Sequence, residues 1–125
     1  MNWTEWANDA VATLAMSSGQ GDEAWVGLFA PGGTYQDPVT AQTSDVAAVF
    51  AVTRSSFPDW EMTVTSASGD STGGVMEWIG RGHLPHGPAV VLHGCSVIDL
   101  SSEAKVVRWR DYFSMGEFAR QASMP

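Results

Sequence analysis

The sequence predicts an α+β fold, a cone-shaped α+β barrel in which helices pack on the concave face of a strongly curved, mostly antiparallel sheet. Apolar residues recur at helical spacing in the first half of the chain, and four longer segments with strand character follow. Clusters of Gly, Ser, Asp and Pro separate these segments, as is typical of an antiparallel meander. A sheet curved in this way would leave a cavity with a closed bottom beneath the helices.

Three helices and a short strand are expected before the meander. The helices are predicted over residues 4–18, 23–29 and 45–55, and their candidate N-caps are Thr4, Asp22 and Ser44. A Pro-Gly-Gly segment at 31–33 is expected to end the second helix, and a strand at 34–36 follows it and stops before Pro38. The four strands of the meander are predicted over residues 60–67, 74–84, 89–100 and 105–114, with a last helical turn or two over 116–122.

Length and composition indicate one globular domain over residues 1–125. A chain of 125 residues can bury one real core without disulfide or metal staples. Apolar residues make up 44% of the chain and charged residues 16%, which is a globular composition with few surface charges. Six Trp residues are many for this length, and large rings also suit the walls of a pocket for a hydrophobic ligand.

Charge and targeting signals exclude several classes of partner. The formal net charge is -8, with 6 basic against 14 acidic residues, so we expect no nucleic-acid and no membrane partner. The first residues lack a basic segment followed by an apolar run, and no stretch approaches the length of a membrane span. A single Cys, Cys95, cannot form an internal disulfide and fits a reducing compartment, so a cytoplasmic location is expected.

Asp111 is the leading candidate for acid/base chemistry. Strand alternation places Val107, Trp109, Asp111 and Phe113 on one face of the last strand, so this carboxyl lies among apolar side chains. Burying a carboxylate there costs folding free energy unless the group is paired with another group or has a function. Burial would raise its pKa towards neutral pH, where it could accept or donate a proton. The alternative is that Asp111 lies at the end of the sheet and only accepts a hydrogen bond from a loop amide.

Two further pairs of residues could complete the site. Arg81 and His83 share a face of an earlier strand; if that face lines the pocket, Arg81 can pair with Asp111 and His83 can bind a substrate oxygen or a water. The alternative is a solvated face with ordinary charges. Tyr35 and Asp37 also share one side of a short strand and could hold a water, although Asp37 could simply form an Asx turn before a proline.

The three histidines lack the spacing of metal ligands, so no metal is expected. The acid/base chemistry predicted below uses no other cofactor.

Four segments carry a resemblance to a known family, and it covers nearly the whole chain. They are LFAPGGTYQDP at 28–38, SSFPDWEM at 55–62, EWIGRGHL at 77–84 and VVRWRDYFSMGEF at 106–118. The chain resembles the nuclear-transport-factor-2-like superfamily, and within it the SnoaL-like polyketide cyclases and the limonene-epoxide-hydrolase-like proteins. The resemblance implies the cone fold, but this fold hosts enzymes, binders and adaptors alike.

The resemblance also implies roles for the candidate residues. Carried over from the epoxide hydrolases, the base falls on Asp111, the arginine on Arg81 and the tyrosine on Tyr35. His83 stands where that family has a second Asp, and Asp37 stands where it has an Asn. The cyclases use the same strand Asp for an aldol ring closure. Ketosteroid isomerases have a base in a DPV context, which resembles the segment that begins at Asp37, but the tyrosine of their oxyanion hole has no match on the first helix.

These observations predict an enzyme that performs cofactor-free acid/base catalysis on a hydrophobic polyketide-, terpenoid- or steroid-like substrate. Epoxide hydrolysis and aldol-type cyclisation are its two versions, and an isomerase that uses Asp37 is an alternative. The rings from which the substrate-binding walls are drawn are Trp25, Phe29, Phe57, Trp60, Trp78, Trp109 and Phe113. A non-catalytic ligand-binding or dimerisation module is the other alternative. The resemblance implies a homodimer paired through the outer sheet face, which would carry Arg108, Arg110 and Tyr112.

Overall fold

A six-stranded, curved sheet with helices on its concave side forms the protein, and the computed structural model describes residues 1–123. The strand order is β2-β1-β6-β5-β4-β3, and every neighbouring pair is antiparallel except the parallel pair β1–β6. The helices are α1 (Trp3–Ala12), the 3-10 turn η1 (Thr13–Ala15), α2 (Ser18–Gly27), α3 (Val46–Ser56) and α4 (Met115–Ala122). The strands are β1 (Phe29–Asp37), β2 (Thr40–Thr43), β3 (Glu61–Asp70), β4 (Gly73–His83), β5 (Ala89–Leu100) and β6 (Val106–Phe113).

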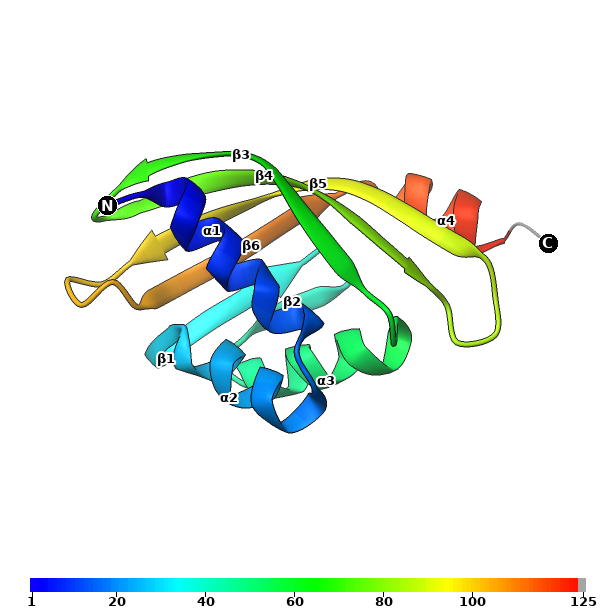
Figure 1. The fold of residues 1–125 in the computed structure, drawn as a ribbon, viewed down its shortest axis with the longest axis horizontal. Coiled ribbons are helices and arrows are strands. Elements are labelled where there is room, and N and C mark those ends of the chain that lie inside the picture. Colours follow the sequence, from blue (N-terminus) through cyan, green and yellow to red (C-terminus); the bar gives the residue numbers. More distant parts are fainter. Residues whose placement is uncertain (124–125) are drawn as a thin grey trace.

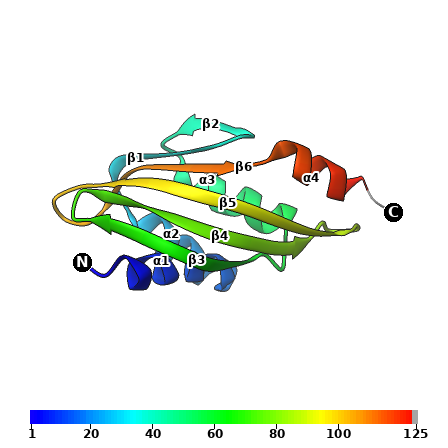
Figure 2. The same cartoon turned by 90° about the horizontal axis from the view of Figure 1, so that it is seen from above.

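The predicted fold class is confirmed, with the difference that the sheet stays open between its edge strands β2 and β3. In Figure 1 the helices α1, α2 and α3 lie on one side of the curved sheet. Figure 2, turned by 90°, shows the strands side by side in the order given above and α4 extending beyond the end of β6. The space enclosed by the sheet and these helices holds both the core and the cavity described below.

The second helix and the first strand differ from the expected ranges. The helix α2 begins at Ser18, not Glu23, because Gly21 lets it pack closely against the ring of Phe50 in α3 and this contact outweighs the low helix propensity of glycine. The strand β1 runs through Pro31 and the glycines after it, although these were expected to precede the strand. Its pairing with β6 is irregular between Phe29 and Thr34, so the proline replaces no regular ladder bond.

The strand β6 contains an irregularity that changes one expected orientation. Its register against β5 shifts between Asp99 and Leu100, which leaves an extra residue in β6. As a result Val106 is fully buried, whereas Val107 is 45% exposed and does not share the inner face with Trp109. The expectation for Val107 was therefore wrong. Beyond the bulge the alternation holds, and Tyr112 is exposed.

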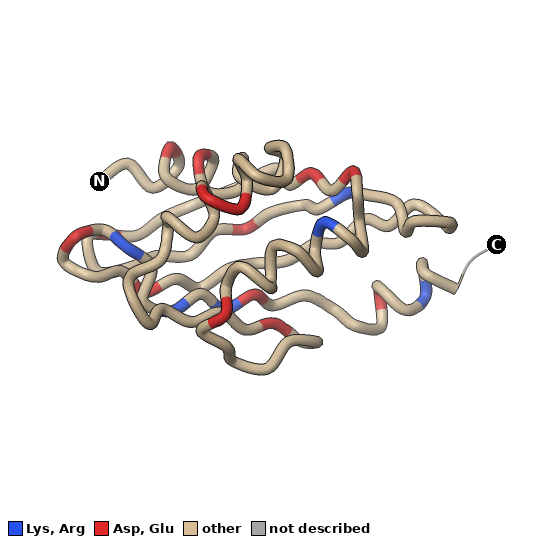
Figure 3. Tube along the Cα trace, turned by 90° about the horizontal axis from the view of Figure 1, so that it is seen from below, with Lys and Arg blue, Asp and Glu red and all other residues tan. Residues whose placement is uncertain are grey.

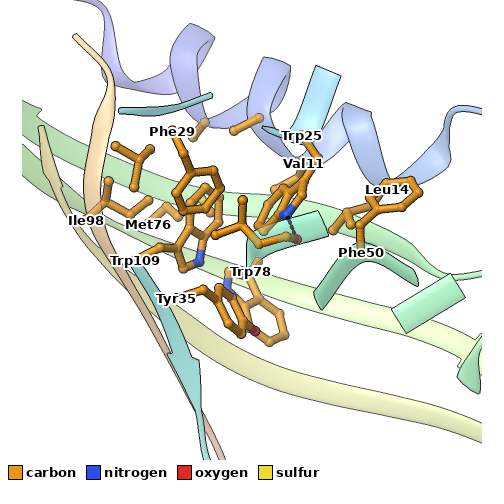
Figure 4. Packing of buried hydrophobic residues seen from close by; sticks show 14 of the residues in the cluster. Val11, Leu14, Trp25, Phe29, Tyr35, Phe50, Met76, Trp78, Ile98 and Trp109 are labelled. Carbon is orange, nitrogen blue, oxygen red and sulfur yellow. Dashed lines mark hydrogen bonds between the residues drawn. The ribbon is translucent and has the colours of Figure 1, made fainter. Parts of the chain in front are cut away.

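Tryptophan side chains form hydrogen bonds that link helices to one another and to the sheet. The indole Nε1 of Trp3 in α1 donates to the carbonyl of Asp70 in β3 at 2.9 Å. The Nε1 of Trp25 in α2 donates to the carbonyl of Val46 in α3 at 2.7 Å, the bond drawn in Figure 4. These bonds satisfy the buried indole donors, so the large rings are buried without leaving an unmet polar group. Among residues 1–123, no helix has both the length and the apolar character needed to cross a membrane.

Candidate active site

A cavity of about 520 Å³ lies between the concave face of the sheet and the helices. Every helix except α1 contributes to its lining, as do η1, β1 to β6 and the loops around α3. Most of this lining is apolar, and its aromatic members are Trp25, Tyr35, Phe50, Phe57, Trp60, Trp78, Trp109, Phe113 and Phe118. The polar side chains are few, and Asp111 is among them. A concave apolar site with few polar groups is the usual form of a small-molecule site.

Asp111 lies in β6 on the inner face of the sheet and accepts hydrogen bonds at both carboxyl oxygens. Its Oδ1 accepts a hydrogen bond from Oγ of Ser96 in β5, and a second from Nε1 of Trp109 at 2.7 Å. Its Oδ2 lies 2.8 Å from the hydroxyl of Tyr35 in β1. Three neighbouring strands therefore hold this carboxyl in one orientation, and one lone pair of Oδ2 remains free for a ligand.

Tyr35 connects Asp111 to a second carboxyl. Its hydroxyl also lies 2.8 Å from Oδ2 of Asp37, whose Oδ1 accepts a hydrogen bond from the backbone N–H of Val39. A phenol has only one proton to donate, so it can satisfy one of the two carboxylates at a time. Both short contacts are hydrogen bonds only when one carboxyl carries a proton. The group formed by Asp37, Tyr35 and Asp111, called the acid triad below, therefore has a place for one shared proton.

The surroundings of the acid triad shift its titration. Burial raises the pKa of Asp111 to about 6, and the hydrogen bonds from Ser96, Trp109 and Tyr35 only partly oppose this rise. Burial and the two neighbouring carboxylates raise the pKa of Tyr35 well above its ordinary value of 10. Asp111 can therefore exchange a proton near neutral pH, which is the property expected of an acid/base catalyst.

Ser96 was not among the sequence candidates. It lies on the neighbouring strand β5 and donates a hydrogen bond that orients Asp111. It is fully buried, and its Oγ accepts a hydrogen bond from Nε1 of Trp78 at 2.9 Å while donating to Asp111. On β5 it occupies an inward position between the apolar residues Leu92 and Ile98. The signal in the sequence is a serine at a strand position that alternation assigns to the buried, apolar face.

The structure does not bring Arg81 or His83 to this site. On β4 the inward positions belong to Trp78, Gly80 and Gly82, so the expected pairing of Arg81 with Asp111 is wrong. His83 lies on the surface, where its Nδ1 is 2.7 Å from Oδ2 of Asp59. The hydrogen bonds from this histidine lower the pKa of Asp59. The physical reason is which face of β4 points inward. Gly80 and Gly82 occupy the inner face because the ring of Trp60 packs against them, and so Arg81 and His83 point outward.

Six of the seven rings expected in the substrate-binding walls line the cavity, and Phe29 does not. The Phe29 ring packs behind the wall, with its centroid 5.1 Å from that of Trp25 and 6.2 Å from that of Trp109. In Figure 4 the rings of Trp25, Trp109 and Tyr35 lie together between the helices and the sheet. Phe29 is thus part of the core that supports the wall.

The open α+β cone is the fold of the nuclear-transport-factor-2-like class of proteins. Within this class the chain belongs to the SnoaL-like domain family, whose sequence profile matches residues 9–109. No curated protein is significantly similar to the chain in sequence.

Three solved structures illustrate the shared fold. A protein of Catenulispora acidiphila DSM 44928 with a ketosteroid isomerase-like fold, in complex with trimethylamine, has a TM-score of 0.86 at 20% identity, over 99% of this chain and 96% of its own. A protein of Jannaschia sp. CCS1 assigned as a SnoaL-like polyketide cyclase has a TM-score of 0.79 at 17% identity, over 98% and 94%. An epoxide hydrolase of M. tuberculosis of the limonene-epoxide-hydrolase-like type has a TM-score of 0.74 at 12% identity, over 94% and 86%.

Proposed function

We propose that this protein is an enzyme that uses cofactor-free acid/base catalysis on a hydrophobic small molecule. The observation that carries the proposal is the position of Asp111, whose carboxyl is held by three hydrogen bonds and lines an apolar cavity of about 520 Å³. Its pKa of about 6 lets it act as a base at neutral pH while remaining able to hold a proton. Catalysis is therefore assigned to the carboxyl itself, held by three hydrogen-bond donors.

The acid triad supplies both halves of a proton transfer. Oδ2 of Asp111 takes a proton from a water or from a carbon next to a carbonyl. The oxygen on which negative charge develops then receives the proton of the Tyr35 hydroxyl, and Asp111 returns its proton to Tyr35 across their hydrogen bond. The acid triad gains one proton and gives one back in each catalytic cycle. The number of protons it holds is therefore unchanged, and no further proton donor or acceptor is needed. This role for Tyr35 replaces the role that Arg81 and His83 cannot take, because both lie outside the cavity.

Two reactions fit this proton balance. In epoxide opening, water loses its proton to Asp111, its oxygen bonds to the epoxide carbon, and the released alkoxide oxygen is protonated by the triad. In aldol-type ring closure, Asp111 removes the proton of a carbon acid, the new carbanion attacks a carbonyl carbon, and the triad protonates the resulting alkoxide. The fold neighbours assigned as a polyketide cyclase and as an epoxide hydrolase support these two reactions. The apolar lining supports a polyketide-, terpenoid- or steroid-like substrate.

The proposal is tested with a panel of apolar epoxides and 1,5-diketones, followed by mass spectrometry. Hydrolysis adds the mass of one water, whereas aldol closure leaves the mass unchanged and alters retention. Asp111→Asn should lower turnover by about two to four orders of magnitude because a positioned general base contributes that much. The control is Asp9→Asn, which removes the same charge from the exposed face of α1 and should leave turnover unchanged.

Retained turnover in Asp111→Asn would contradict the proposal. If apolar ligands bind but no compound of the panel reacts, the non-catalytic binding module becomes the better interpretation.

A further inference from the structure

Every charged side chain that lines the cavity is acidic. Asp37, Asp45 and Asp111 contribute carboxyls, and within residues 1–123 no Lys, Arg or His side chain reaches the lining. Figure 3 shows the Lys and Arg positions scattered along the chain. Two of these cations have other partners: Arg54 donates from Nη1 to the carbonyl of Leu14 at 2.7 Å, and Arg110 lies 3.8 Å from Asp99. Asp45 accepts a hydrogen bond from the backbone N–H of Ala48, and Asp37 accepts one from that of Val39, but no cationic side chain of the described residues faces these carboxyls in the cavity.

The acid triad lacks one positive partner. From β1 the groups that titrate and face Asp111 are Tyr35 and Asp37, and the segment before α3 contributes Asp45 at the lining. The remaining elements around the cavity contribute only apolar or hydroxyl side chains to it. Because the Tyr35 hydroxyl can donate to one carboxylate only, the other can accept a further hydrogen bond from a cation. The site can thus take one added positive charge.

The aromatic walls favour the same kind of ligand. Trp78 and Trp109 place their indole rings beside the acid triad, since Nε1 of Trp109 donates to Asp111 and Nε1 of Trp78 donates to the Ser96 that supports it. Trp25 and Trp60 also line the cavity. An indole ring attracts a cation that lies over its face. An anion would instead meet the carboxylates of Asp37 and Asp111.

We propose that this cavity selects its ligand by charge, and that it takes an apolar amine in its ammonium form in preference to a neutral analogue and excludes carboxylates and phosphates. The ammonium takes the place of the shared proton between the carboxylates of the acid triad and, in that complex, is itself the group that returns a proton to the developing oxygen. The apolar body of the ligand lies among the Trp rings. This inference deepens the proposed function, on which it rests, by assigning a substrate class to the same site.

Proton linkage follows from this exchange. Asp111 has a pKa of about 6 in the free protein, so below that pH the shared proton competes with the ammonium. Binding of the ammonium should therefore tighten as the pH rises from 5 to 7 and should release a proton when it occurs near pH 6. A neutral ligand displaces no proton and should show neither effect.

The test is calorimetric titration with three ligands of one shape, 2-naphthylmethylamine, 2-naphthylmethanol and 2-naphthoate, at pH 7.5. We expect the ammonium to bind about tenfold more tightly than the alcohol, which corresponds to about 1.4 kcal/mol, and the carboxylate not to bind. Near pH 6, titrations of the amine in buffers with different ionisation enthalpies should show proton release. Asp111→Asn should abolish both the preference for the ammonium and the proton release, whereas Asp9→Asn should retain them.

Five outcomes would overturn the inference, and the first four concern the carboxylate, the whole ligand set and the two variants. They are equal binding of the carboxylate, absence of binding by all three ligands, an ammonium preference that survives in Asp111→Asn, and a preference that falls equally in Asp9→Asn, since the last would reflect net charge alone. If the alcohol binds as tightly as the ammonium, the substrate class is wrong. The proposed acid/base function would still stand on its own turnover test.

Discussion

The hydroxyl of Tyr35 lies 2.8 Å from Oδ2 of Asp111, and an equal distance separates it from Oδ2 of Asp37. The first contact joins β1 to the parallel neighbour β6, and the second stays within β1. One phenolic proton cannot serve two carboxylates, so the Tyr35 hydroxyl donates to only one of them at a time. The behaviour of the cavity towards protons and ligands depends on this arrangement.

Tyr35→Phe should raise the pKa of Asp111 further. The substitution removes a hydrogen bond that stabilises the ionised carboxylate and leaves the burial of Asp111 in place. Side-chain carboxyl NMR titration measures the change. Tyr112→Phe is the matched control because that tyrosine is 46% exposed, and it should leave the titration of Asp111 unaltered. A lowered or unchanged pKa in Tyr35→Phe would show that this hydroxyl does not bond to Asp111.

Ser96→Ala should raise the pKa of Asp111 and also destabilise the fold. The change removes a donor to the carboxylate and leaves Nε1 of the buried Trp78 without its acceptor. A buried donor left unsatisfied costs about 1–3 kcal/mol, which urea denaturation detects. The control is Ser66→Ala, which removes a hydroxyl bonded to Glu77 on the exposed part of the sheet and should cost less. Equal stability of the two variants would argue against a structural role for Ser96.

Asp111→Asn should make the protein more stable than the wild type at neutral pH. The pKa of Asp111 is about 6 in the folded protein, against 3.8 for an ordinary Asp, so the folded state binds more protons between pH 4 and 6. The contribution of this carboxyl to stability therefore falls as the pH rises through that window, by up to about 3 kcal/mol. The Asn side chain can accept hydrogen bonds from Ser96 and Trp109 and donate one to Tyr35. It therefore keeps these contacts without the free-energy cost of a buried charge.

The free energy of unfolding, measured from pH 4 to 8, checks this prediction. The advantage of Asp111→Asn over the wild type should grow up to pH 7, while the curve of Asp9→Asn should run parallel to that of the wild type. An advantage that shrinks with rising pH would mean that Asp111 is held ionised in the folded state.

Gly80→Ala should disturb the wall of the cavity. A Cβ on this residue would overlap the ring of Trp60, which lines the cavity, so the ring must move. Such overpacking costs about 1–3 kcal/mol and should weaken the binding of apolar ligands. Gly19→Ala in α2 is the control, because no atom lies within 4 Å of its added Cβ, and it should stabilise the helix by about 0.5–1 kcal/mol. Unchanged ligand affinity in Gly80→Ala would place Trp60 outside the binding wall.

The fold class and the position of Asp111 could both be predicted from the sequence, because both depend on local patterns. Strand alternation from Trp109 to Phe113 and helical spacing in the first half are local patterns, and both hold in the structure. Val107 departs because a bulge depends on the pairing partner, here at Leu100, and not on the strand itself.

The errors at Arg81 and His83 have a similar origin. The segment at 77–83 has two faces, and the sequence pattern favours the one with charged residues as the functional face. The other face carries Trp78 and two glycines, and a glycine in a strand marks the close approach of another group, here the ring of Trp60. Only the packing of β3 and its preceding loop against β4 decides which face is inside. Ser96 went unnoticed because its role exists only through Trp78 and Asp111 on the neighbouring strands.

The titration of Asp111 in the wild-type protein, followed by side-chain carboxyl NMR, tests the central claim most directly. The account predicts a pKa of about 6, unchanged in Arg81→Met because that arginine lies on the outer face of β4. A value near the ordinary 3.8, or a marked rise on removal of Arg81, would mean that an ion pair holds the carboxyl ionised. The acid triad could not then share a proton.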